Sequence, residues 1–131
     1  MFYFLRGMSE LFFKKESYAI IGICMEVHRV LGMGFKEIVY KDALIVEFTN
    51  KKIPFTKEQL FSIEYKGIIL PHKFCADFVL FDSIILEVKS APIMLDKFFS
   101  QTLNYIKAAK LKLGIIANFG EQSFNYKRVV Y

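Results

Sequence analysis

The stretch "CADFVLFDSIILEVKS", residues 75–90, indicates two apolar strands joined by a short turn. Three of its positions are charged, namely Asp77, Glu87 and Lys89, although the residues around them are of the kind that fill a core. A lone carboxylate in a buried sheet is costly unless it is paired or bound to a metal. The hairpin therefore predicts a central sheet with a charged site at one of its edges.

The length of the turn decides which side chains can meet. Glu87 and Lys89 are two residues apart on one strand, so they project from the same face. A two-residue loop would place Asp77 on the other face, whereas an odd loop, such as 81–83, makes Asp77 oppose Glu87. We predict an odd loop or a bulge, because only that register brings both carboxylates together.

Two carboxylates in such proximity repel unless a divalent cation lies between them. Hard oxygen ligands favour Mg²⁺ or Mn²⁺, and Lys89 could orient or deprotonate a water or offset phosphate charge. The alternatives are structural. Asp77 could cap a turn or pair with Lys73 or Lys89, and Glu87 with Lys89 could form an exposed cross-strand ion pair.

The rest of the chain supplies helices and strands around this hairpin. Residues 17–31 have helical periodicity and end at Gly32, and residues 35–51 form a second expected helix that Pro54 ends. The remaining expected elements are strands over 55–65, 68–70, 73–81 and 84–89, a helix over 95–112, and strands over 113–119 and 123–131. This order, ααβββ(β)αββ, predicts an α/β (α+β) domain with a mixed central sheet flanked by helices.

Composition limits the class of protein. The 131 residues are 54% hydrophobic and 17% aromatic, which predicts one domain over 1–131, with 1–16 as a partly disordered extension. So many aromatic side chains indicate either an unusually aromatic core or a surface covered by a second subunit, as in a homodimer. No apolar run is long enough for a membrane helix, so we expect a cytoplasmic protein. Cys24 and Cys75 lack metal-ligand or disulfide spacing and are expected to be buried thiols.

Several short motifs occur in a characteristic order. They are "MEVHRVLGMGFKEIVY" at 25–40, "YKG" at 65–67, "ADFVL" at 76–80, "EVK" at 87–89, "QTLNY" at 101–105 and "NFG" at 118–120. Over about residues 17–130 this order resembles the GxxExxY protein family of the PD-(D/E)xK nuclease superfamily, although Ala76 stands where the superfamily pattern has proline. The resemblance implies a restriction-endonuclease-like core with the hairpin at its centre.

The resemblance also implies roles for individual residues. Asp77, Glu87 and the backbone carbonyl of Val88 correspond to metal ligands, and His28 corresponds to a helix histidine that serves as a further ligand in a related exonuclease branch. The implied catalytic residues are Lys89, Glu37, Gln101 and Tyr105. Each assignment has a structural alternative: Glu37 could pair with Lys41 on a solvated helix face, and His28 could be a structural helix residue.

The function that follows is a Mg²⁺- or Mn²⁺-dependent nuclease. It would hydrolyse phosphodiester bonds of nucleic acid by a metal-activated water, and DNA is expected as the substrate rather than RNA. A formal net charge of +5 suits a polyanionic partner. The alternative is a non-catalytic nucleic-acid-binding or assembly module on a nuclease-like scaffold.

Overall fold

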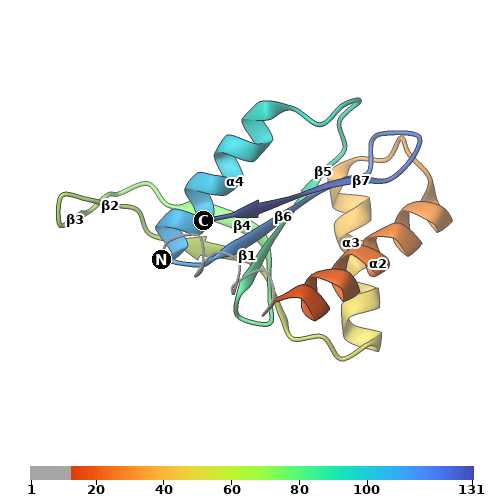
Figure 1. Ribbon diagram of the computed structural model, residues 1–131, viewed down its shortest axis with the longest axis horizontal. Helices are drawn as coiled ribbons and strands as arrows, with labels where there is room; N and C mark the ends of the chain where they lie inside the picture. The colour runs from red at the N-terminus through yellow and green to blue at the C-terminus, as the bar shows by residue number, and fades with distance from the viewer. Residues whose placement is uncertain (1–12) are drawn as a thin grey trace.

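The computed structural model describes residues 13–131, and Figure 1 shows two layers of helices around a sheet. Most of the expected extension, 1–16, therefore lies outside the described residues, and residues 14–16 open the helix that runs from Lys14 to Leu31. The helices are α2 (Lys14–Leu31), α3 (Glu37–Asn50) and α4 (Asp96–Ala109). The strands are β1 (Phe55–Phe61), β2 (Glu64–Tyr65), β3 (Ile68–Ile69), β4 (Phe74–Leu80), β5 (Ile84–Lys89), β6 (Leu113–Asn118) and β7 (Asn125–Val130).

The main sheet has five strands in the order β1-β4-β5-β6-β7. The β5–β6 pair is parallel and the other three pairs are antiparallel, so the predicted mixed sheet is confirmed. Helices α2 and α3 cover one face and α4 covers the other (Figure 1). Because both faces are covered, the central strand β5 is buried from Ile84 to Val88, and Glu87 is the one position in this range that is not apolar.

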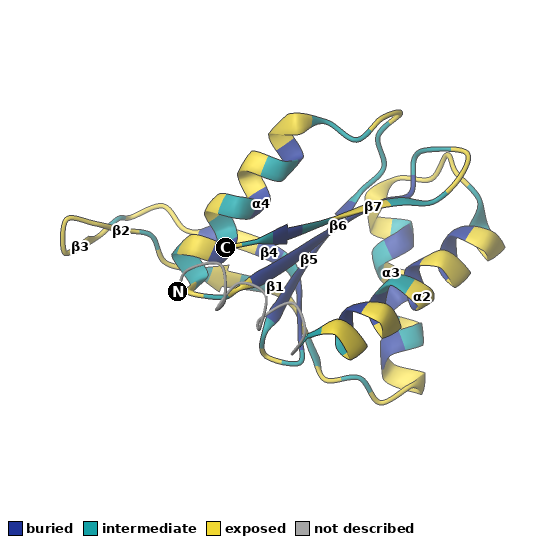
Figure 2. Ribbon diagram, viewed as in Figure 1, coloured by how far each residue is buried: buried dark blue, intermediate teal, exposed yellow. Residues whose placement is uncertain are grey.

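The sheet divides the interior into two hydrophobic cores, and its central strands are drawn largely as buried in Figure 2. The larger core lies under α2 and α3 and contains fully buried rings, such as Tyr40, Phe48 and Phe78. The smaller core lies under α4 and includes Phe98 and Ile106. Much of the aromatic content thus fills the interior, whereas a second subunit stays a prediction.

The turn between β4 and β5 has the expected odd length. Leu80 pairs with Ile84, and the register continues as Val79 with Ile85 and Phe78 with Leu86. The loop is therefore the three residues 81–83, with positive φ angles of 55° and 53° at its first two positions. Extending this register by one residue places position 77 opposite position 87, as predicted.

The "YKG" motif forms the tip of a two-stranded arm, β2–β3, which extends away from the body of the molecule (Figure 1). Lys66 and Gly67 both have positive φ, as a tight hairpin turn requires.

The prediction that both cysteines are buried thiols is half right. Cys24 is buried, but Cys75 is exposed because it projects opposite the buried Phe74 and Ala76 and pairs with Leu60, which is also exposed. Among the described residues, no helix has the length and apolar character needed to cross a membrane.

Candidate functional site

Strands β4 and β5 separate beyond the Phe78–Leu86 pair, and side chains then accept the hydrogen bonds that the backbone would have made. The Asp77 amide donates to Glu87 Oε2 at 2.9 Å, and the Val88 amide donates to Asp77 Oδ2 at 2.8 Å. We call Asp77, Glu87 and Val88 the strand fork. Its two carboxylates therefore satisfy backbone donors as well as carrying charge.

The alternation of side chains between the two faces of the sheet is interrupted in β4 at Asp77. Phe78 and Leu80 point into the core under α2 and α3, whereas Ala76 points into the core under α4. Since alternate residues of a regular strand share one face, this pattern requires an irregularity between them. It occurs at Asp77, whose expected partner Glu58 is skipped in the β1–β4 pairing and has a φ of 52°. The irregularity lets the Asp77 carboxylate reach a helix that covers the sheet.

That helix is α3, and the contact is an ion pair. Lys41 Nζ lies 2.6 Å from Asp77 Oδ1, and both side chains are less than one fifth exposed. Partial burial acts to lower the pKa of Lys41, but the hydrogen bond and charge of Asp77, with the charges of Glu58 and Glu37, raise it overall. Asp77 is thus paired, but with neither of the lysines that the sequence suggested.

Glu87 is buried, with 3% of its surface exposed. Burial raises its pKa from 4.5 to about 7, and the negative charge of Asp77 acts in the same direction. The Asp77 amide and the charges of Lys89 and Lys41 oppose this rise without cancelling it. A cation entering the strand fork would relieve the repulsion and favour the ionised carboxylate.

The residues expected to carry catalysis beside the strand fork come from β5 and α4. Lys89 Nζ lies 3.2 Å from Gln101 Oε1, to which it donates, and 4.9 Å from the centre of the Phe98 ring. Tyr105 stacks on Phe74 with ring centres 4.3 Å apart. Burial and then the charges of the two strand-fork carboxylates raise the pKa of the Tyr105 phenol. The Gln-x-x-x-Tyr pair of α4 therefore lies next to the lysine and the acids.

Glu37 and His28 lie farther out. Glu37 is the exposed first residue of α3 and borders a surface hollow of about 630 Å³ with Ser90, the residue after Lys89. His28 is buried and its Nε2 lies 2.9 Å from the Glu121 carbonyl. Within residues 13–131, no three His, Cys, Asp or Glu side chains cluster as a metal site. Glu37 and His28 therefore stay predicted ligands or assistants, and neither completes a three-residue cluster with the strand fork.

The donors of the strand fork fit a hard divalent cation. Two carboxylates supply oxygen ligands, and ions such as Mg²⁺ keep several water ligands when few protein groups bind them. Burial first, and then the negative charge of Asp77, raise the pKa of Glu87, and a cation bound between the two carboxylates would oppose both effects. Lys41 is the one cation already hydrogen-bonded to an oxygen of this pair among the described residues.

Sequence reasoning missed two residues that shape the site. Lys41 was considered only as a local partner of Glu37, because the two are four residues apart on one helix. Asn118 was noted within "NFG" without a role. It is fully buried and forms two hydrogen bonds with the backbone of Ala91. Its side-chain oxygen accepts from the Ala91 N–H and its side-chain nitrogen donates to the Ala91 carbonyl, each at 3.0 Å. Asn118 thereby fixes the chain just after Lys89, which pairs with Asn118 across β5 and β6.

Comparisons with known proteins agree with this architecture. No curated protein matches the chain. A solved structure described as the crystal structure of SSO0001 matches with a TM-score of 0.58 and 16% identity, over 72% of this chain and 50% of the other. An alkaline exonuclease, LHK-Exo from Laribacter hongkongensis, matches with a TM-score of 0.51 and 9% identity, over 68% of this chain and 53% of the other. This chain thus spans about half the length of both, and at such identities the likeness shows the fold alone.

The family model described as "PD-(D/E)XK nuclease superfamily" matches residues 14–129, nearly the whole described chain. The chain therefore belongs to the PD-(D/E)XK nuclease superfamily.

Proposed function

We propose that this protein is a metal-dependent nuclease that hydrolyses phosphodiester bonds, with DNA as its substrate. The observation that carries the proposal is the strand fork, where the ladder opens and two carboxylates meet beside Lys89. Superfamily membership supports the reaction class. Within the superfamily, the order of the motifs supports assignment to the GxxExxY family.

Each residue has a definite task in this proposal. Asp77, Glu87 and the Val88 carbonyl hold Mg²⁺ or Mn²⁺, which when bound makes water more acidic and offsets phosphate charge. Lys89 positions the attacking water or the phosphate, and the hydrogen bond to Gln101 fixes the direction of its ammonium group.

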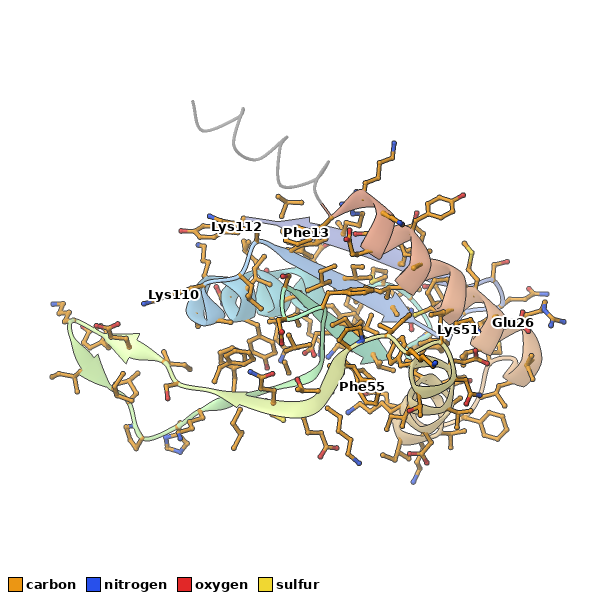
Figure 3. All side chains as sticks on the ribbon, turned by 90° about the horizontal axis from the view of Figure 1, so that it is seen from below. Phe13, Glu26, Lys51, Phe55, Lys110 and Lys112 are labelled. Atoms are coloured by element: carbon orange, nitrogen blue, oxygen red, sulfur yellow. The ribbon has the colours of Figure 1, made fainter. Side chains whose placement is uncertain are left out.

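Three further residues act from the margins of the site. Glu37 accepts a proton or a water hydrogen bond from the open side, and Tyr105 contacts the substrate from α4. His28 remains a candidate additional ligand. The basic surface, including Lys110 and Lys112 at one end of the molecule (Figure 3), supplies non-specific phosphate affinity that weakens with salt.

One observation favours the alternative of a non-catalytic nucleic-acid-binding module. Lys41 already neutralises Asp77, and both strand-fork carboxylates accept backbone hydrogen bonds. The fork is therefore partly satisfied without a metal. A protein of this kind would bind nucleic acid in a salt-dependent way and release no product.

The test compares wild type with Glu87→Gln and Lys89→Ala on single- and double-stranded DNA and RNA, with Mg²⁺, Mn²⁺ or a chelator. Lys66→Ala, which removes a lysine from the exposed arm, is the matched control. We expect cleavage of DNA to need the metal and to drop about 100-fold or more in both site variants, the scale of losing a positioned catalytic group. The control should keep wild-type activity.

Two results separate the alternatives. Equal activity in all four proteins would mean that the site is wrongly assigned or the activity is a contaminant. Binding without cleavage in the wild type, unchanged in Glu87→Gln, would establish the non-catalytic module instead.

A further inference from the structure

Lys41 has no task in the proposed reaction, yet its ammonium group is acted on by several acidic side chains. Besides Asp77, the negative charges of Glu58 on β1 and Glu37 one turn earlier on α3 act on its ammonium group. Asp42 and Lys57 line the same small hollow. Lys41 is therefore attracted by several acids, although within residues 13–131 only Asp77 forms an ion pair with it.

The space around this ion pair is small. The hollow that Lys41 and Asp77 line has a volume of about 30 Å³, much smaller than the hollow of about 630 Å³ beside Glu37. A divalent cation keeps several oxygen ligands around it, and one bound at Asp77 Oδ1 would lie against the ammonium group. Sterics and like-charge repulsion both oppose occupation of that oxygen by the two cations together.

We propose that Lys41 is a built-in counter-cation of the strand fork, which a divalent metal must displace from Asp77 in order to bind. This inference rests on the metal site of the proposed function and adds its regulation. In the metal-free protein, Lys41 offsets the repulsion between the two carboxylates. When metal enters, the displaced ammonium group turns toward Glu58 or Glu37, which already attract it.

The inference predicts opposite effects of one substitution on two properties. Lys41→Met keeps much of the apolar stem and removes the charge. The metal-free protein should become less stable, because Asp77 loses its ion pair and the repulsion between Asp77 and Glu87 is then offset less. Metal should bind about 10-fold more tightly, because it no longer competes with the ammonium group for Asp77. The hydrogen bond between that ammonium group and Asp77 has about the free energy that a 10-fold change in affinity requires.

The experiment is a calorimetric titration of Mn²⁺, and separately Ca²⁺, into the full chain without nucleic acid. The proteins are wild type, Lys41→Met, Lys41→Arg and Lys51→Met. Lys51 is the control because it forms an ion pair with Glu47 at the other end of α3 (Figure 3). The distance between Lys51 Nζ and Glu47 Oε2 is 2.7 Å, similar to that between Lys41 and Asp77. We expect tighter binding only in Lys41→Met, with Lys41→Arg and Lys51→Met near wild type. Circular dichroism verifies that each variant is folded.

A second measurement uses the wild type alone, so it does not depend on any variant folding. Acetylation of lysines by acetic anhydride, read by mass spectrometry, should modify Lys41 slowly without metal and faster with saturating Mn²⁺. Lys51 should show no such change. Faster modification of Lys41 reports its release from Asp77.

The possible failures are distinguishable. Wild-type affinity or weaker binding in Lys41→Met, or a Lys41 reactivity that metal does not change, would overturn the inference but leave the metal site and the nuclease proposal standing. No metal binding in any of the proteins would overturn both the inference and the metal site. Absence of nuclease activity with tighter binding in Lys41→Met would support the inference and count against catalysis.

Discussion

Glu87→Gln should change how the stability of the metal-free protein depends on pH. The pKa of Glu87 is about 7 in the folded protein and near its ordinary value of 4.5 when unfolded. Below pH 4.5 the carboxyl is protonated in both states. Between pH 4.5 and 7 only the unfolded chain releases the proton, so the free energy of unfolding decreases as pH rises.

The size of this decrease follows from the two pKa values. They are about 2.5 pH units apart, and each unit corresponds to about 1.4 kcal/mol. Wild type should therefore lose at most about 3 kcal/mol in total, most of it between pH 4.5 and 7 and the rest within about one unit above pH 7. Glutamine does not ionise in this range, and its side-chain oxygen can still accept the Asp77 amide. The variant should lack the decrease and exceed wild type in stability at pH 8.

The assay is urea unfolding followed by circular dichroism at half-unit steps from pH 4.5 to 8.5, with a chelator present. Glu64→Gln, which removes an exposed acid from β2, controls for the loss of one negative charge. Its profile should parallel that of wild type. A Glu87→Gln profile parallel to wild type, or a variant less stable than wild type at pH 8, would refute the account of Glu87 as a buried, repelled carboxylate.

Three further substitutions test the scaffold by urea unfolding. Asn118→Ala leaves the half-buried N–H and carbonyl of Ala91 without their partner and should cost about 2–4 kcal/mol; a cost below about 1 kcal/mol would show that water replaces the amide. Gly120→Ala would place a methyl carbon 2.4 Å from the Ala91 backbone and should cost about 1–3 kcal/mol, whereas wild-type stability would mean that this loop shifts freely. Tyr40→Phe removes the 2.6 Å hydrogen bond to the Gly32 carbonyl and should cost about 1 kcal/mol at an unchanged denaturant slope, and a stabilised variant would contradict that bond.

Local patterns in the sequence were enough to predict the fold. The apolar strands 73–81 and 84–89 and the helical periods around them correspond to β4, β5 and the three helices within a few residues. The odd loop at 81–83 was predicted from chemistry, because only that register lets Asp77 and Glu87 meet. Periodicity and register are properties of neighbouring residues, so they can be read without knowing the tertiary structure.

The interactions that shape the site are not local. The sequence offers Glu37, four residues earlier on the same helix, as a local alternative partner for Lys41, but an exposed pair of that kind contributes only a few tenths of a kcal/mol. Asp77 lies less than one fifth exposed at the irregular point of β4, where it competes better for the same ammonium group. No pattern within α3 reveals that the helix crosses the sheet at this point.

The polar positions of the hairpin now have a physical explanation. In a continuous ladder, the amides of Asp77 and Val88 would bond to backbone carbonyls and the two acids would be unpaired in a buried sheet. Because the strands part, each acid accepts an amide that the opening left without a carbonyl. The opening and the acids therefore require each other. A single apolar replacement at position 77 or 87 would leave a buried N–H unsatisfied, whereas the isosteric Glu87→Gln keeps that bond and isolates the charge.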